Sequence, residues 1–180
     1  GVDPLTGKEV GLKTGDPLKF TGIEQIMDAL KAQCIHCYDN IMRGYNIVVG
    51  YHITYMPTSF SSMVMEGCID SGKCTQEGGV KYTNTTTFFC GAASVADSLA
   101  AIDTLVFQKH KLTMAQLLDA MDKNFEGCED IRQMLINDAP KFGNDIDYVD
   151  AFARKIVNYC ADYVQQPDHK DARGGQYCLS

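Results

Sequence analysis

Apolar residues recur at three- and four-residue steps over residues 22–43, which is the pattern of a helix with one buried face. Thr21 and Glu24 have the spacing of a capping box at its start, and Gly44 lies near its end. The apolar stripe consists of Ile23, Ile26, Met27, Leu30, Cys34, Cys37 and Ile41. We therefore predict a long amphipathic helix that follows the turn-rich residues 1–20.

The same helical period returns in the second half of the chain. Thr113 and Gln116 have the spacing of a second capping box. A short helix capped by Thr58 or Ser59 is expected in the first half. The four later helices are predicted over residues 93–107, 113–126, 129–138 and 146–164.

Residues 80–89 are rich in β-branched and aromatic side chains and form the best strand candidate. Residues 165–180 have the polar composition of a tail. A single strand cannot form a sheet, because its backbone groups would lack partners. Either further strands are hidden in the chain, or the partner strands of residues 80–89 lie in polypeptide outside these 180 residues, and we favour the second alternative.

Composition excludes two classes of partner. Lys and Arg total 16 against 23 Asp and Glu, a net charge of −7, whereas nucleic-acid binders normally carry a basic excess. No apolar run approaches the length of a membrane span, and the first residues lack the layout of a secretion signal. We expect no nucleic-acid or membrane partner.

Eight cysteines are spread along the chain, and we expect them to be reduced thiols in a cytoplasmic protein. Cys34 and Cys37 form a C-x-x-C pair around His36, which is typical of a redox pair or of half a zinc site. A zinc site needs a second pair of ligands, and the sequence has no other C-x-x-C or H-x-x-x-H. Packing on the helix face is therefore the preferred interpretation.

Familiar catalytic motifs are absent from the sequence. It has no Gly-x-Ser-x-Gly elbow, no phosphate-binding loop and no local signature around its four histidines. Asp145, Asp147 and Asp150 resemble the start of a calcium loop, but the Gly and Glu of such a loop are missing at their offsets. Helix-start capping explains them better, so we expect no metal ligands.

Longer strings carry more information than these motifs. In chain order they are GGVKY at 78–82, ADSLAAI at 96–102, LVF at 105–107, NFEG at 124–127, APKFGND at 139–145 with Val149-Asp150, and ARGG at 172–175. With GVDPLTG at 1–7 and KTGDP at 13–17, they resemble the glycyl radical enzymes, the pyruvate formate-lyase-like superfamily. The branch they resemble comprises dehydratases and carbon–heteroatom lyases.

This resemblance implies an α/β fold, a ten-stranded barrel wrapped in helices. Residues 1–180 would form an internal, mostly α-helical segment of the pyruvate formate-lyase-like domain, with about one barrel strand. The segment would lie between the loop that carries the radical Cys and the loop that carries the glycyl radical. That position would account for the missing initiator Met and the single strand.

The resemblance also implies an activity. A thiyl radical would abstract hydrogen from a small polar substrate, leading to C–O, C–N or C–S elimination or to formate-lyase-type C–C cleavage in anaerobic metabolism. No cofactor would bind directly, because a radical SAM activating enzyme installs the glycyl radical in such proteins. We expect this activase and the small-molecule substrate as partners, and allow for a homodimer.

In the family, the radical Cys loop reads Gly-Cys-Val-Glu or similar and the glycyl loop reads Arg-Val-x-Gly-Tyr or similar. Neither string occurs here, so we expect no catalytic residue in this chain. Cys68, in Gly-Cys-Ile-Asp, superficially resembles the radical Cys loop, but its context matches a different stretch of the family and buried packing is preferred. The loop after the predicted strand departs from the family pattern Thr-Gly-Pro-Gln-Gly-x-Gly. Phe88, Phe89 and Cys90 stand there and are our substrate-pocket candidates, with packing against helices as the alternative.

Two other function classes stay open on the sequence alone. The chain could be a free-standing helical binding or accessory module without catalysis of its own. It could also be a thiol redox or metal protein built on Cys34 and Cys37. The first would bury its helix stripes within a compact monomer, and the second would show a metal or reactive thiols.

Overall fold

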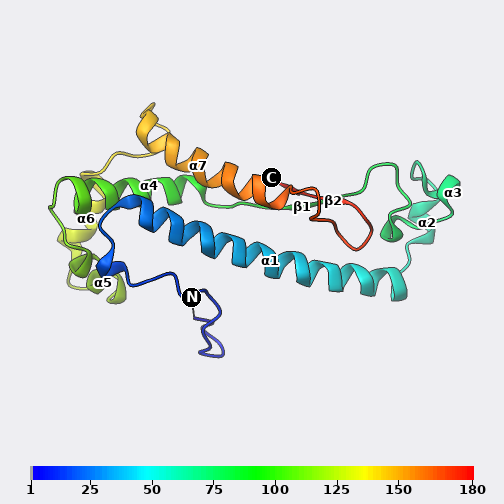
Figure 1. Cartoon of the computed structure of the whole chain (residues 1–180), viewed down its shortest axis with the longest axis horizontal. Coiled ribbons are helices and arrows are strands. Elements are labelled where there is room, and N and C mark those ends of the chain that lie inside the picture. Colours follow the sequence, from blue (N-terminus) through cyan, green and yellow to red (C-terminus); the bar gives the residue numbers. More distant parts are fainter. Residues whose placement is uncertain (1) are drawn as a thin grey trace. The chain divides into compact units, whose positions relative to one another are not determined.

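The computed structural model describes residues 2–180, and Figure 1 labels its helices and strands. The chain divides into two compact units. The first comprises the described residues up to Gln33 together with Cys90–Tyr159, and the second comprises Cys34–Phe89 with Cys160–Ser180. Two long helices, α1 (Ile23–Tyr55) and α7 (Asp147–Val164), each contribute residues to both units. No helix within residues 2–180 is long and apolar enough to cross a bilayer.

The first unit contains the helices predicted for the second half of the chain. They are α4 (Ala92–Ile102), α5 (Met114–Asp122), α6 (Glu129–Asn137) and the first part of α7. The unit also contains η1 (Pro17–Lys19), a short 3-10 helix that was not predicted. Directly after α4 the chain continues as a π-helix, η3 (Asp103–Gln108), whose side chains at 103–106 are buried. Leu105 is fully buried against Ala101 and Ala139, so this wider turn lies in the core of the unit.

The two predicted capping boxes have different outcomes. At α5, the Thr113 hydroxyl accepts a hydrogen bond from the Gln116 backbone N–H while the Gln116 side chain accepts one from the Thr113 N–H, as predicted. Before α1, the Thr21 N–H donates instead to Gln25 Oε1, 2.6 Å away. Glu24 pairs with Lys155 of α7 at 3.3 Å, and this competing partner explains the difference.

Helix α1 runs well beyond its predicted end near Gly44. The reason is that burial continues on one face, at Tyr38, Met42 and Val49, and outweighs the helix cost of about 1 kcal/mol for glycine. Cys37 and Ile41, which we placed on the apolar stripe, are exposed, so the stripe assignment is wrong at these two positions.

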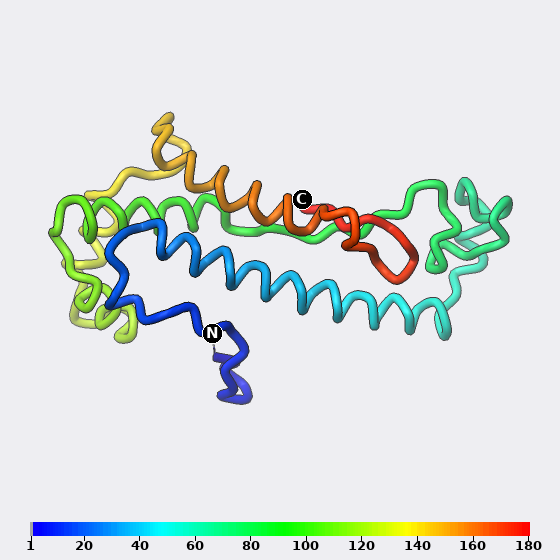
Figure 2. Tube along the Cα trace, viewed as in Figure 1, coloured from blue at the N-terminus to red at the C-terminus, as the bar shows by residue number. Residues whose placement is uncertain are grey.

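The second unit contains the only sheet formed by residues 2–180. Strand β1 (Asn84–Thr87) pairs in parallel with β2 (Gln176–Leu179), from Asn84 opposite Gln176 to Thr87 opposite Leu179 (Figure 2). β1 confirms the centre of the predicted strand. Two expectations are wrong: the partner of β1 does not lie outside the chain, and residues 165–180 are more than a tail. The sequence did not predict β2, because a strand of only four residues, preceded by glycines and polar residues, gives too weak a strand pattern.

Short helices connect α1 to β1 in this unit. They are α2 (Ser59–Ser62), which starts after Thr58 as predicted, α3 (Cys68–Ser71) and η2 (Thr75–Glu77). The large side chains around α2 are exposed, among them Phe60, Met63 and Val64. This part of the second unit therefore leaves apolar surface uncovered by residues 2–180.

Candidate functional site

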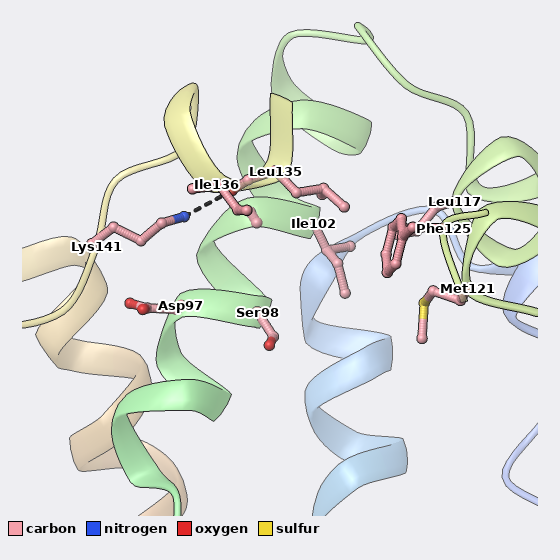
Figure 3. Close-up of a pocket in the computed structure, with 10 residues that line it drawn as sticks. Asp97, Ser98, Ile102, Leu117, Met121, Phe125, Leu135, Ile136 and Lys141 are labelled. Carbon is pink, nitrogen blue, oxygen red and sulfur yellow. Dashed lines mark hydrogen bonds between the residues drawn. The ribbon is translucent and has the colours of Figure 1, made fainter. Parts of the chain in front are cut away.

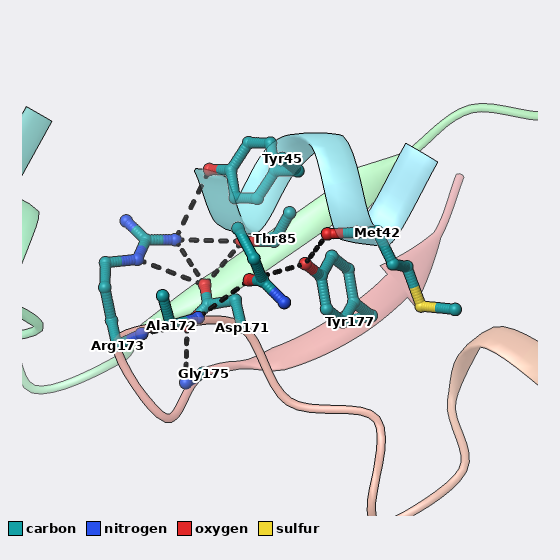
Figure 4. Close-up of polar contacts among 9 residues, drawn as sticks. Met42, Tyr45, Thr85, Asp171, Ala172, Arg173, Gly175 and Tyr177 are labelled. Atoms are coloured by element: carbon teal, nitrogen blue, oxygen red, sulfur yellow. Dashed lines mark hydrogen bonds and ion pairs between the residues drawn. The ribbon is translucent and has the colours of Figure 1, made fainter. Parts of the chain in front are cut away.

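A buried ion pair lies at the amino end of the strand pair (Figure 4). The Asp171 side chain has no exposed surface, and its Oδ2 accepts hydrogen bonds from Arg173 Nη2 and from the Thr85 hydroxyl, both at 2.6 Å. Asp171 Oδ1 accepts from the backbone N–H groups of Arg173 and Gly175 at 2.8 and 2.9 Å. Both carboxylate oxygens are thus satisfied, which a buried charge requires.

The electrostatics of this cluster keep both partners charged. Burial raises the pKa of Asp171, but the hydrogen bonds from Arg173 and Thr85 and from two backbone N–H groups outweigh it, and the net pKa lies below its ordinary value. Burial lowers the pKa of Arg173, and the Asp171 carboxylate more than reverses that effect. The pair is therefore an ionised link between β1 and the turn that leads into β2.

Tyrosines extend the cluster to α1. The Tyr177 hydroxyl lies 3.0 Å from Asn46 Oδ1 and 3.2 Å from the Met42 carbonyl oxygen, while its ring packs edge-on against Tyr45 with centroids 6.2 Å apart. The Ala172 N–H donates to the same Asn46 oxygen at 2.8 Å. Helix α1, β1 and β2 are consequently held in a fixed register by polar groups, as the dashed lines of Figure 4 show.

The substrate-pocket candidates follow the carboxyl end of β1. The Phe89 N–H donates to the Ser180 carbonyl oxygen at 3.0 Å, which extends the pairing of β1 and β2 by one step. Phe88 is 71% exposed, Phe89 is half-buried and Cys90 is exposed. In α/β barrels, residues at the carboxyl ends of parallel strands form the ligand site. Their role as pocket residues stays a prediction.

A cavity of about 310 Å³ lies in the first unit, between α4, α5 and α6 (Figure 3). Three strings of the resemblance contribute to it: Asp97 from 96–102, Phe125 from 124–127 and Lys141 from 139–145. Asp97 Oδ1 accepts the Phe142 N–H at 2.7 Å, and Lys141 Nζ donates to the Leu135 carbonyl oxygen at 2.8 Å. The polar groups are thus engaged with backbone, and side chains such as Ile102, Leu117 and Met121 make the remaining wall mainly apolar.

Asp103 is a further buried carboxylate, at the start of the π-helix. It accepts hydrogen bonds from the Tyr148 hydroxyl and from Gln108 Nε2, the latter at 2.7 Å. Burial and the Asp103 carboxylate both raise the pKa of Tyr148, which therefore stays a proton donor to this carboxylate. Sequence reasoning missed the Asp103 and Asp171 sites, since each also depends on a partner more than 40 residues away, Tyr148 for Asp103 and Thr85 for Asp171.

No three His, Cys, Asp or Glu side chains of residues 2–180 lie where they could hold a metal ion together. Cys34 and Cys37 differ in exposure, because Cys34 is half-buried on α1 and Cys37 faces solvent. Cys68 is buried at the first position of α3, with 4% of its surface exposed. Asp147 and Asp150 lie in the first turn of α7, where carboxylates favour the helix dipole.

Known proteins match nearly the whole chain. The family model described as pyruvate formate lyase-like matches residues 1–180. Trans-4-hydroxy-L-proline dehydratase of Clostridioides difficile is 36% identical over 98% of the chain, and isethionate sulfite-lyase of Oleidesulfovibrio alaskensis is 35% identical over 82%. The chain spans only 22% and 18% of the lengths of these two relatives.

Solved structures agree with the sequence matches. The hydroxyproline dehydratase of C. difficile, with trans-4-hydroxy-L-proline bound, overlays 99% of the chain with a TM-score of 0.92 at 35% identity. The B12-independent glycerol dehydratase of Clostridium butyricum overlays 99% with a TM-score of 0.90 at 32% identity. In each case the chain covers 22% of the solved structure. These overlays confirm the predicted fold class, a mostly helical α/β segment of a glycyl-radical-enzyme barrel, and the chain belongs to the pyruvate formate lyase-like family.

Proposed function

We propose that the polypeptide that carries this chain is a glycyl radical lyase or dehydratase that eliminates a C–O, C–N or C–S group from a small polar substrate. The observation that carries this proposal is the 36% identity to trans-4-hydroxy-L-proline dehydratase over 98% of the chain. The relatives named as (2S)-3-sulfopropanediol dehydratase and isethionate sulfite-lyase belong to the same reaction class. All of them remove a leaving group from a small, hydroxyl-bearing molecule.

The radical groups are proposed to come from outside these 180 residues. When present, a glycyl radical and its partner thiol supply hydrogen abstraction from the substrate. Cys68 does not fit the thiol's role, since it is buried within α3 of the second unit. In place of radical groups, this chain would contribute the β1–β2 pair, the charged cluster that fixes it, and the pocket residues that follow β1.

Phe88, Phe89 and Cys90 are proposed to line the substrate pocket. Two features support this role: the three residues follow the carboxyl end of a parallel strand, and Phe88 is 71% exposed rather than packed in the core. Two phenyl rings would make the adjoining pocket bulky and apolar, and would therefore favour a compact substrate with an apolar face.

A radical SAM activase is proposed as the protein partner, and homodimerisation as a further association. A cytoplasmic location is also proposed, supported by eight cysteines that are all unpaired. Anaerobic metabolism is the setting in which such radical chemistry operates.

Turnover under anaerobic conditions tests the function. The polypeptide that carries this chain would be incubated with a radical SAM activase and S-adenosylmethionine, and then with trans-4-hydroxy-L-proline, glycerol, propanediol or isethionate in turn. Dehydration or sulfite release from one of these compounds is the expected result. If the activated protein carries the radical but forms no product from any of these compounds, the proposed elimination chemistry is contradicted.

The role of Phe88 has its own test. Phe88→Ala should change the ratio of kcat/KM between two accepted substrates by at least about tenfold, since removing a ring reshapes the pocket wall. Tyr82→Ala is the matched control, because Tyr82 is 78% exposed and precedes β1. Equal effects of the two substitutions would assign Phe88 to packing.

A further inference from the structure

A second cavity in the first unit lies beside the buried carboxylate of Asp103. Its volume is about 270 Å³, and the first turn of α1, the start of η3 and the first part of α7 surround it. Both polar and apolar groups line this cavity, and the polar ones are Glu24, Asp103, Tyr148 and Lys155. None of the roles proposed above uses these four side chains.

Asp103 lacks the counter-ion that the other buried carboxylate has. Asp171 is paired with Arg173. Asp103 is only 7% exposed, and its Oδ2 accepts hydrogen bonds from two neutral groups, the Tyr148 hydroxyl and Gln108 Nε2. Among residues 2–180, no lysine, arginine or histidine forms an ion pair with it. Because buried charges in proteins are normally paired, this carboxylate is suited to receive a cation.

The cavity as a whole carries one negative charge in excess. Lys155, the cation that lines it, is paired with Glu24 at 3.3 Å, so these two charges balance each other. Tyr148 adds no charge, because burial and the Asp103 carboxylate both raise the pKa of its hydroxyl. The Asp103 carboxylate is the charge left without an opposite one. A ligand that complements the cavity therefore carries a single positive charge.

The rest of the wall suits an organic cation. Tyr148 and Phe152 lie one turn apart on α7 with ring centroids 5.2 Å apart, and both line the cavity. Aromatic rings attract ammonium groups. Ile23 and Ala151 add aliphatic surface to the wall. The cavity thus combines the carboxylate, aromatic and aliphatic groups that bind an alkylammonium ion.

We propose that the cavity beside Asp103 is a binding site for a small primary alkylammonium ion. The ammonium group donates hydrogen bonds to the Asp103 carboxylate and lies near the Tyr148 ring. The alkyl chain contacts Phe152 and Ile23. A volume of about 270 Å³ lies below the usual range for drug-sized ligands, so the chain is a short one.

Propylammonium chloride is the probe for this site, and 1-propanol is its neutral counterpart. Isothermal titration calorimetry on the folded polypeptide that carries this chain measures the binding of each compound at equal ionic strength. We expect saturable binding of propylammonium and no binding of propanol. Equal binding of the two compounds, or no binding of propylammonium, overturns the proposal. The titration needs neither activase nor turnover, so its failure leaves the proposed activity untouched.

Two substitutions locate the bound probe. Asp103→Asn removes the charge and keeps the shape, and should weaken propylammonium binding by at least about tenfold, because hydrogen bonds to charged groups are the stronger kind. Ala151→Leu fills the cavity without changing a charge and should weaken binding as well, which gives a second test if Asp103→Asn does not fold.

Asp119→Asn is the matched control for the lost charge. Asp119 is exposed, pairs with Lys123 and lies outside the cavity, so this variant should bind propylammonium as the parent does. Circular dichroism verifies that each variant is folded. An unchanged affinity in folded Asp103→Asn or in folded Ala151→Leu would show that the probe binds elsewhere, and would overturn the proposal.

Discussion

Arg173 and Asp171 form a buried ion pair with 2.6 Å between Nη2 and Oδ2, and the hydroxyl of Thr85 on β1 contacts both partners. This triangle joins two segments that lie more than 80 positions apart in the sequence. Arg173 and Gly175 belong to the string ARGG, which contributed to the family resemblance. In the structure, Arg173 and Gly175 of this string hold β2 beside β1 through their contacts with Asp171.

Asp171→Asn should destabilise the protein by at least about 2 kcal/mol, because it leaves the Arg173 charge buried without its counter-ion. Chemical denaturation followed by circular dichroism measures the change. Asp119→Asn is the matched control, since its ion pair with Lys123 is more than half exposed and should leave the midpoint unchanged. Equal losses in the two variants would contradict a special role for the buried pair.

Acid should weaken the same contact. The pKa of folded Asp171 lies below the ordinary value of 3.8, so its stabilisation is complete above that value and is lost as pH falls through the lower, folded pKa. Unfolding midpoints measured from about pH 6 down to about pH 3 should therefore fall more steeply for the parent protein than for Asp171→Asn. Parallel pH curves would show that Asp171 titrates normally.

Two glycines should respond to alanine with opposite signs. A Cβ on Gly175 would lie 2.6 Å from the Thr83 carbonyl oxygen, so Gly175→Ala should push β2 from β1 and cost about 1–3 kcal/mol. Gly44 is an exposed residue inside α1 with nothing within 4 Å of the added Cβ, so Gly44→Ala should stabilise by about 1 kcal/mol. Thermal unfolding of both variants tests this contrast, and a stabilising Gly175→Ala would refute the close approach.

The capping box of α5 allows a local test. Thr113→Ala removes the hydroxyl that accepts the Gln116 N–H and should cost about 1 kcal/mol. Thr113→Ser keeps the oxygen and should restore most of that loss. Hydrogen exchange of the first amides of α5 follows the effect directly. An unchanged exchange rate in the alanine variant would mean that tertiary packing alone holds this helix end.

Local signals in the sequence predicted most of the helices, because their apolar period and caps lie within a few residues of each other. Residues 114–122 and 147–164 are clear cases. The extension of α1 past Gly44 and the strand at 176–179 were not predictable in this way, since burial against distant residues decides both. The same holds for the site: Phe88 could be singled out as a departure from a family string, but the buried contacts of Asp171 exist only in the folded chain.

Electron paramagnetic resonance of the anaerobically activated polypeptide tests the central claim most directly. The measurement would compare samples with and without a radical SAM activase, S-adenosylmethionine being present in both. A stable carbon-centred radical, split by a single α-hydrogen and dependent on the activase, is the predicted result. The contradicting result is the absence of this signal from a folded polypeptide that carries this chain, contains the glycyl loop string and binds the activase. Such a polypeptide would not be a working glycyl radical enzyme.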